Sequence, residues 1–296
     1  MFRNTYINKN ERRIGEKSVN KLELMKIANE VRKGVIVGTY HAKSGHPGGS
    51  LSAADIFTYL MFEEMNTDPK NPKKADRDRF VLSKGHTAPG YYAAMALRGF
   101  LPVEDMKLLR KTGSYLQGHP DMKQVPGVDM SSGSLGQGIS AAVGMAISAK
   151  LSKEDYRVYT LLGDGEIQEG QVWEASMLAG FRKLDNLVVI VDNNNLQIDG
   201  AVDEVNSPYP MDKKFEAFNF HVITIDGNDF DQIEAAFKEA RATKGMPTAI
   251  IAKTIKGKGV SFMENQVGWH GVAPNDEQYA DAMEELEKAG EALCQM

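Results

Sequence analysis

The sequence contains almost no cysteine. Of its 296 residues only Cys294 is a cysteine, two positions before the end. A single cysteine can form neither a disulfide framework nor a cysteine-ligated zinc site. The fold must therefore depend on a hydrophobic core, and 42% hydrophobic residues over this length are enough for one large domain.

Long apolar runs and an excess of basic residues are also absent. No run of about 18 apolar residues is present that could span a membrane, and the polar first twenty residues lack the apolar core of a signal peptide. Lys and Arg number 35 against 40 Asp and Glu, which gives a net charge of −5. No basic stripe for nucleic acid is present. We expect no nucleic-acid or membrane partner and a cytoplasmic location.

Near-continuous apolar strands alternate with amphipathic helices, a pattern typical of a parallel sheet with helices on both faces. We expect a polar N-terminal arm at residues 1–20 and a single α/β domain at 21–296. The expected helices lie near residues 22–41, 51–61, 87–100, 139–150, 169–183, 229–243 and 276–293, and the last is acidic and packs on the outside. The expected strands lie near residues 156–164, 186–192, 221–226 and 247–254, and residues 78–86 are expected to form a short strand that enters a loop.

The segment "GDGEIQEG" at 163–170 follows one of these strands, where open α/β sheets bind ligands. It lacks the Lys and Ser or Thr of a P-loop, the third glycine of a dinucleotide fingerprint and the oxygen spacing of a calcium loop. A glycine turn with solvated acids is the alternative interpretation of this octet alone.

A second loop, "VDNNNLQIDG", follows the next strand, about thirty residues on. Two consecutive parallel strands end at the same edge, so we expect Asp164 and the asparagines at 193–195 to be neighbours. Carboxylate, amide and carbonyl oxygens are the ligands that hard cations prefer, and glycine lets a phosphate approach the backbone. Together the two loops predict a site for magnesium and a diphosphate.

G-D-G followed about thirty residues later by N-N is similar to the signature of thiamine diphosphate enzymes. The wider sequence resembles the N-terminal, diphosphate-binding portion of transketolase, from about Leu22 to Pro274. Seven motifs occur in the order of that family: "SGHPGGSLS", "DRDRFVLSKGH", "GHPD", "GSLGQGIS", "GDGEIQEGQVWEAS", "VDNNNLQIDG" and "GWHGVAP".

The resemblance implies thiamine diphosphate and a divalent metal, either magnesium or another cation such as calcium or manganese. It implies that Asp164 and Asn194 bind the metal through side-chain oxygens and Leu196 through its carbonyl, where the family commonly has isoleucine. Further residues are implied to contact the cofactor: Gly165 and Asn194 at the diphosphate, Gly133, Ser134 and Leu135 at the aminopyrimidine, and Ile198 as an apolar support. Ser134 stands where the family often has proline.

Four of the six histidines lie beside glycine in loops. Alone, such a histidine is more often structural, and no zinc-binding spacing is present. The resemblance implies that His46 and His270 handle the reacting sugar hydroxyls and that His119 binds the terminal hydroxyl of the two-carbon fragment. It implies that His86 and His270 donate to the diphosphate. His41 and His221 are expected to be structural or surface residues.

Two of the acidic residues match subunit-interface positions of the family. The resemblance implies that Glu169 and Glu174 share protons between paired active sites, so Glu169 counts among the catalytic residues. Glu166 matches a variable position, and we expect it to be solvated. Two interpretations of Lys256 and Lys258 are left as alternatives. The lysines form either a solvated basic turn or a lid over the diphosphate.

A full transketolase chain is about twice as long as this sequence, whose end after the last helix reads as a natural one. We therefore expect the N-terminal subunit of a split transketolase of the pentose phosphate pathway, in an α2β2 heterotetramer. The C-terminal subunit would supply the pyrimidine-binding domain, and sugar phosphates would be the substrates. The alternatives are the alpha subunit of a 2-oxo acid dehydrogenase and a non-catalytic scaffold of the same fold.

Overall fold

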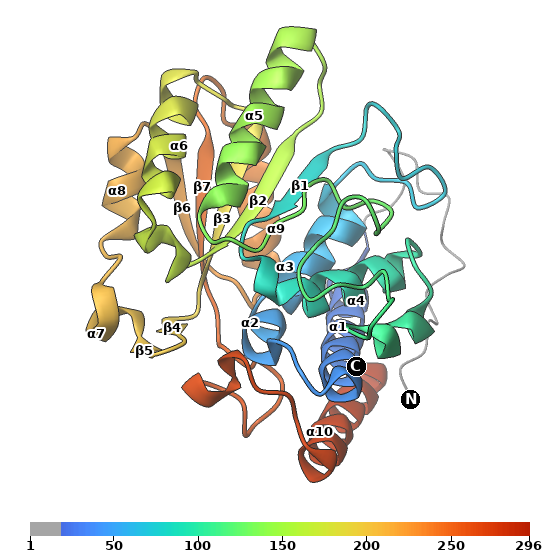
Figure 1. Cartoon of the computed structure of the whole chain (residues 1–296). Coiled ribbons are helices and arrows are strands. Elements are labelled where there is room, and N and C mark those ends of the chain that lie inside the picture. The colour runs from blue at the N-terminus through green and yellow to red at the C-terminus, as the bar shows by residue number, and fades with distance from the viewer. Residues whose placement is uncertain (1–18) are drawn as a thin grey trace.

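A five-stranded parallel sheet organises the computed structural model, which describes residues 19–296 (Figure 1). Most of the N-terminal arm expected at residues 1–20 lies outside the described residues. The strand order is β1-β2-β3-β7-β6, which confirms the expected α/β class. The strands are β1 (Arg79–Leu82), β2 (Val158–Gly163), β3 (Leu187–Asn193), β6 (His221–Asp226) and β7 (Thr248–Lys253).

Helices cover both faces of this sheet. On one side lie α1 (Lys21–Ala42), α2 (Pro47–Ser52), α3 (Ala54–Tyr59), α4 (Ala88–Arg98), α9 (Phe230–Ala242) and α10 (Asp276–Gln295). On the other side lie α5 (Gln137–Ser152), α6 (Gly170–Phe181) and α8 (Met211–Ala217). A short hairpin, β4 (Leu196–Gln197) with β5 (Gly200–Ala201), and α7 (Val202–Asn206) follow β3.

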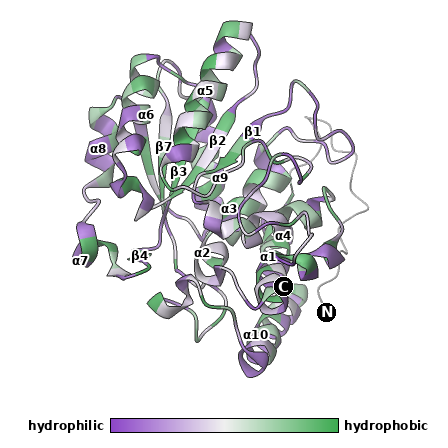
Figure 2. Ribbon diagram, viewed as in Figure 1, coloured by the Kyte–Doolittle hydropathy of each residue, from purple (hydrophilic) through white to green (hydrophobic). Residues whose placement is uncertain are grey.

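The central strand β3 shows why both faces need cover. All seven of its residues are buried. Val189 and Val191 pack into the core beneath α5 and α6, and Val188 and Ile190 pack into the opposite core. Because successive side chains of a strand point to opposite faces, an unbroken apolar strand needs a layer on each side. Figure 2 shows the hydrophobic residues on the strands and inner helix faces.

Two helix starts are set by local capping. The Asn20 side chain accepts the N–H of Glu23 at 2.8 Å at the start of α1. At α10, Asn275 and Gln278 form a reciprocal capping box. The acidic α10 packs against α1 on the outside of the molecule, as expected.

The helix expected at 51–61 is wrong in its bounds. The structure begins a helix at Pro47, four residues before the expected start, and continues through α3 into a π-helical turn at Leu60–Glu64. Proline is favourable at the first helical position, and the glycines lie where a side chain would not fit. A Cβ on Gly48 would lie 2.8 Å from the carbonyl oxygen of Trp269.

Candidate active site

Two loops meet at the carboxyl edge of the sheet. Strands β2 and β3 pair in register up to Gly163 and Asp192, so the residues that follow them are neighbours. The buried carboxylate of Asp164 accepts the N–H of Gly165 at 2.8 Å and the N–H of Asn195 at 2.5 Å. The expected proximity of these two loops is confirmed.

The oxygen atoms gathered here fit a divalent cation. Burial, followed by the charge of Asp192, raises the pKa of Asp164 to about 7, so a cation would offset an unfavourable negative charge. Asn194 presents an amide, and its Oδ1 accepts the N–H of Leu196 at 3.2 Å. The Leu196 carbonyl accepts from Lys256 Nζ at 3.0 Å. These are oxygen ligands of the kind that magnesium prefers.

Among residues 19–296, no three His, Cys, Asp or Glu side chains form a group that could hold a metal. The donors expected here are one carboxylate, one amide and one carbonyl, so this site needs only one acidic side chain. The remaining positions of a magnesium ion are usually taken by water and substrate phosphates.

A buried ion pair lies beneath the loops. Asp192 is fully buried and accepts hydrogen bonds from Lys84, from Ser52 Oγ at 2.6 Å and from Thr254. Burial alone would raise the pKa of Asp192, but Lys84 and these hydrogen bonds lower it. The pair ties β3 to the "SKGH" loop and so positions His86. Our sequence interpretation missed this pair, although Lys84 stands two residues before His86.

Glu166 is buried, which corrects the expectation that it is solvated. It is 3% exposed, and Oε1 accepts from Ser83 Oγ at 2.5 Å and from the N–H of Gly136 at 2.9 Å. Its Oε2 accepts the N–H of Gly163 at 3.0 Å. Since a buried carboxylate needs such donors, these contacts explain why it faces inward. Glu166 joins three segments of the site.

The glycines expected at the cofactor stand where space is restricted. A Cβ on Gly133, whose φ is +157°, would lie 3.3 Å from the His119 ring. A Cβ on Gly165 would lie 2.7 Å from Gln197 Oε1. Both glycines therefore let the backbone approach neighbouring groups closely.

Two apolar side chains are exposed at this edge. Leu135 is 38% exposed and Ile198 is 65% exposed, while Ser134 beside Leu135 is also exposed. Leu135 lies in the glycine loop before α5, and Ile198 lies in the loop after β3, the two segments expected to hold the cofactor's rings. Exposed apolar side chains beside a polar site fit an aromatic ligand.

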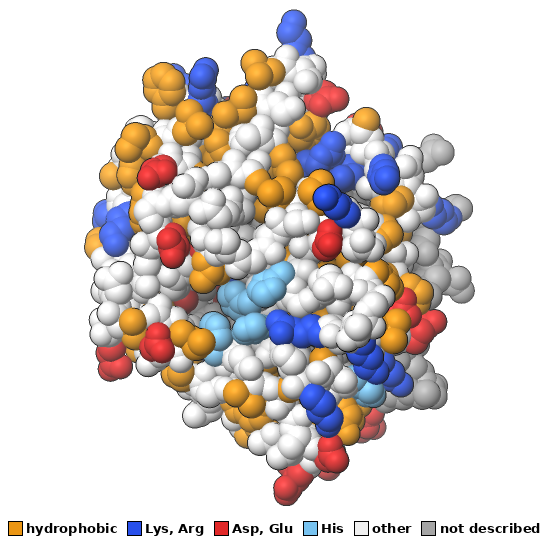
Figure 3. All heavy atoms as spheres, viewed as in Figure 1, with side chains coloured by type: hydrophobic (Ala, Val, Ile, Leu, Met, Phe, Trp, Pro, Cys, Tyr) orange, Lys and Arg blue, Asp and Glu red, His pale blue; other side chains and the backbone are white. Residues whose placement is uncertain are grey.

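The four loop histidines come together. The ring of His46 lies 5.2 Å from that of His86, 5.6 Å from that of His270 and 6.5 Å from that of His119, measured between centroids. The rings of His86 and His270 stack at 5.2 Å. Figure 3 shows histidine side chains gathered at the middle of one face, beside Lys and Arg side chains. Segments more than 200 residues apart supply this cluster.

These imidazoles are held neutral. Burial, followed by the charges of Arg110, His119 and Lys256, lowers the pKa of His46 to about 4. Burial and then Lys256 lower the pKa of His270 to about 3. Burial also lowers the pKa of His86 and of His119. Neutral imidazoles can hydrogen-bond hydroxyl groups and exchange protons with them near neutral pH.

The structure separates the two lysines whose role was open. Lys256 is 1% exposed and contacts His270 Nδ1 at 2.9 Å. Burial, followed by the charge of Lys84, lowers the pKa of Lys256 to about 8. Lys258 instead pairs with Glu264 at 3.5 Å. Only Lys256 of these two belongs to the histidine cluster.

Glu169 and Glu174 are exposed at the beginning of α6.

The two histidines outside the cluster, His41 and His221, were expected to be structural or surface residues. His41 contacts the Val37 carbonyl at 2.9 Å, and His221 contacts Glu239 at 2.6 Å.

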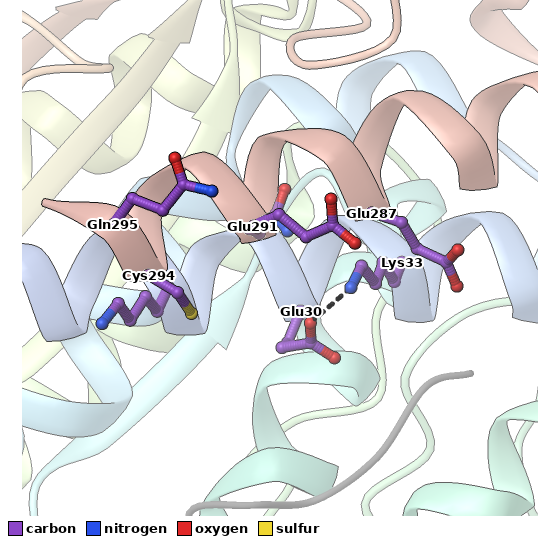
Figure 4. A pocket seen from close by; sticks show the side chains of 9 residues that line it. Glu30, Lys33, Glu287, Glu291, Cys294 and Gln295 are labelled. Carbon is purple, nitrogen blue, oxygen red and sulfur yellow. Dashed lines mark hydrogen bonds and ion pairs between the residues drawn. The ribbon is translucent and has the colours of Figure 1, made fainter.

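A separate pocket lies between α1 and α10 (Figure 4). Its walls carry both signs of charge, and Lys33 pairs with Glu30 at 2.8 Å there. None of its lining residues belongs to the histidine cluster or the two β-strand loops. We therefore assign the chemistry to the sheet edge and not to this pocket.

The family model for the thiamine diphosphate-binding domain of transketolase matches residues 24–290. The chain belongs to the transketolase family. It is 44% identical over 273 residues to a 6-deoxy-6-sulfo-D-fructose transketolase subunit of Clostridium sp. (strain MSTE9), covering 92% of this chain and 99% of the relative. It is 42% identical to an apulose-4-phosphate transketolase subunit of Phocaeicola vulgatus, covering 93% of this chain and 97% of that protein.

Solved transketolases have the same fold. The Campylobacter jejuni transketolase superposes with a TM-score of 0.86 at 37% identity, covering 91% of this chain and 43% of that one. Human transketolase is 47% identical over 256 residues, covering 85% of this chain and 40% of the human protein. The expected family and its thiamine diphosphate-binding domain are confirmed. The matching family model is that of transketolase and not that of a 2-oxo acid dehydrogenase.

Proposed function

We propose that this chain is the thiamine diphosphate-binding subunit of a split transketolase and transfers a two-carbon ketol unit between sugar phosphates. The observation that carries the proposal is the cluster of His46, His86, His119 and His270 beside the Asp164 loop. Four neutral imidazoles suit substrates with many hydroxyl groups better than they suit a 2-oxo acid.

The metal and the cofactor would be held by residues of both loops. Asp164, Asn194 and the Leu196 carbonyl would bind magnesium or a similar divalent cation, and Gly165 and His86 would contact the diphosphate. Gly133, Ser134, Leu135 and Ile198 would lie against the rings of the cofactor. When bound, thiamine diphosphate supplies the carbon nucleophile of the reaction.

Replacing one ligand tests this assignment. Asp164→Ala removes the charged ligand while the diphosphate stays anionic, so we expect cofactor affinity to fall by orders of magnitude. Titration of thiamine diphosphate with magnesium, in the complex with the partner, measures it. An affinity within a few-fold of wild type would exclude Asp164 as a ligand.

The chain's own residues would orient and protect the substrate. His119 would hold the terminal hydroxyl of the two-carbon fragment, and His46 and His270 would contact the reacting oxygens. Because burial keeps these imidazoles neutral, they can bind hydroxyls without placing a fixed charge at the site. The exposed Glu169 and Glu174 would lie at a subunit interface and share protons there between paired active sites.

The partner would be a C-terminal transketolase subunit carrying the pyrimidine-binding domain, in an α2β2 heterotetramer acting in the cytoplasm. Two relatives of similar length are named as subunits, and this chain spans 99% and 97% of them. We expect no turnover from the chain alone with thiamine diphosphate, magnesium, a ketose phosphate and an aldose, and turnover when the partner is added. Substantial activity without a second polypeptide would contradict the proposal of a split enzyme.

A substrate panel distinguishes the specific reactions. The names of two relatives specify a sulfosugar and apulose 4-phosphate, so the panel pairs these donors with the ketose phosphates of the pentose phosphate pathway. Oxidation of a 2-oxo acid with an artificial electron acceptor would favour a dehydrogenase. Absence of cofactor binding in calorimetry would favour a scaffold.

A further inference from the structure

Arg110 occupies an unusual position beside the histidine cluster. Its φ is +58°, in the left-handed region that a residue with a side chain rarely adopts. The backbone is held there by a hydrogen bond from its N–H to the Leu116 carbonyl at 2.8 Å. This turn directs the side chain of Arg110 toward the loops that carry His46 and His119.

The guanidinium joins these two loops. Nη1 donates to Ser44 Oγ at 3.0 Å, and Nη2 donates to the Gly118 carbonyl at 3.5 Å and contacts His46 Nδ1 at 3.4 Å. A Cβ on Gly118 would lie 2.7 Å from Arg110 Cζ, so the guanidinium lies directly against this glycine. Its Nε is buried without a hydrogen-bond partner. The position of the side chain therefore leaves one of its own donors unsatisfied.

The contact with Nδ1 determines where the proton of His46 lies. A guanidinium has only donors and does not lose its proton in proteins. Nδ1 must therefore present its lone pair to Arg110, and a neutral imidazole then carries its proton on Nε2. A second proton on Nδ1 would face the positive guanidinium directly.

The surroundings of His46 oppose that second proton too. The groups that face it are Arg110, His119 and Lys256, with the rings of His86 and His270 packed around it. These neighbours are either cations or imidazole rings, and none of them is a carboxylate. They therefore favour the neutral form of the His46 ring. The Cδ2–Nε2 edge, opposite Arg110, lies 3.6 Å from the position of a Cβ on Gly271, on the side of His270.

We propose that Arg110 is a positioning residue that fixes the tautomer of His46, so that His46 donates a hydrogen bond from Nε2 to a substrate oxygen. His46 then stabilises negative charge on that oxygen and does not act as the base that removes a proton. The proposal deepens the proposed function and rests on it for the identity of the substrate oxygen.

Nitrogen NMR of the histidine rings tests the tautomer directly. The full chain is labelled with ¹⁵N-histidine and bound to its partner, thiamine diphosphate and magnesium, and His46→Gln assigns the His46 signals. We expect a protonated Nε2 and an unprotonated Nδ1 across about one pH unit on either side of neutrality. A protonated Nδ1 in the wild-type protein would overturn the proposal, whether or not ketol transfer is observed.

Arg110→Met keeps an unbranched stem and removes every donor. We expect part of the His46 population to carry its proton on Nδ1, and kcat to fall about 10- to 100-fold with a smaller change in KM. Arg110→Lys keeps a cationic donor, so it should restore much of the Nε2 protonation of His46 and much of kcat. If Arg110→Met lowers kcat but leaves the His46 signals unchanged, Arg110 has only a structural role and the proposal is wrong.

Ser44→Ala is the matched control. It removes the other side-chain partner of Arg110 and leaves the contact with His46 in place. We expect unchanged His46 signals and a kcat within about twofold of wild type. The net contribution of one hydrogen bond to a neutral hydroxyl is small. A tautomer shift in Ser44→Ala equal to that in Arg110→Met would contradict a specific role for the guanidinium. Intact signals with no activity on any sugar would count against the proposed function alone.

Discussion

At the residue scale, we predict that some side chains of the site serve the cofactor and others serve the sugar. His119→Ala should impair ketose turnover and leave cofactor affinity nearly intact, because its expected partner is a sugar hydroxyl. His86→Ala should weaken cofactor binding by roughly one to two decades, the effect of losing one hydrogen bond to a charged group. Calorimetry for the cofactor and steady-state kinetics for the ketose separate the two effects. Equal loss of cofactor in both variants would contradict the assigned roles.

We expect Asp164, as a proposed metal ligand, to make metal binding depend on pH. Burial and Asp192 raise its pKa to about 7 without a metal, so below that pH a proton competes with the cation. We expect the apparent magnesium affinity to fall about tenfold per pH unit below about 7 and to level off above it. Isothermal titration at several pH values measures this dependence.

The histidines should not add a second acid transition to this profile. The pKa values of His46, about 4, and His270, about 3, are lowered, so both rings are neutral throughout the range in which Asp164 titrates. The folded state binds fewer protons than the unfolded state at these rings. Their contribution to stability therefore falls as pH decreases below about 6.5, the pKa of histidine in the unfolded state.

A metal affinity independent of pH between about 5 and 8 would contradict the prediction for Asp164.

At the scale of elements, Glu166 joins the end of β2 to the loop before α5. Glu166→Ala leaves the N–H groups of Gly136 and Gly163 and the Ser83 hydroxyl without their acceptor. We expect the free energy of unfolding to fall by roughly 2–4 kcal/mol. We also expect a loss of cofactor affinity, because both loops are proposed to hold the cofactor. Chemical denaturation of the isolated chain measures the stability.

Two variants calibrate that result. Glu166→Gln keeps one acceptor oxygen and should have an intermediate effect. Glu174→Ala changes an exposed glutamate on the neighbouring α6 and should leave stability within about 0.5 kcal/mol. Similar stability of Glu166→Ala and Glu174→Ala would mean that water replaces the carboxylate without cost.

At the scale of the whole molecule, α5 and α6 expose an apolar face. Leu151 is 79% exposed, Met177 60% and Phe181 74%, and Figure 3 shows hydrophobic side chains gathered over these helices. Patches of this kind mark interaction surfaces. We expect the partner subunit to cover this face, next to Glu169 and Glu174.

Phe181→Glu tests that interface. Burying one phenylalanine contributes about 1.5–3 kcal/mol, so the variant should weaken binding of the partner by roughly 10- to 100-fold. Sedimentation of the mixed subunits measures the affinity, and thermal melting checks that the chain is folded. Leu108→Glu, an exposed apolar residue on the other side of the sheet, should leave assembly unchanged. Equal effects of the two variants would contradict an interface at α6.

The sequence by itself determined the class of fold, the strands that matter and the loops that follow them. Near-continuous apolar strands and amphipathic helices are local patterns, and consecutive parallel strands must end at one edge. For this reason the meeting of Asp164 with the asparagine loop could be predicted without coordinates. The gathering of the four histidines followed only from the family resemblance, because no spacing rule brings such distant loops together.

Only the tertiary structure decided which charged residues face inward. Glu166 reaches its partners Ser83 and Gly136 across 83 and 30 positions of sequence, and its side chain is the same type as that of the exposed Glu169. Lys256 and Lys258 are two positions apart, yet one contacts His270 and the other pairs with Glu264. Burial of a charge depends on donors and acceptors supplied by remote segments, and such partners leave no periodic signal in the local sequence.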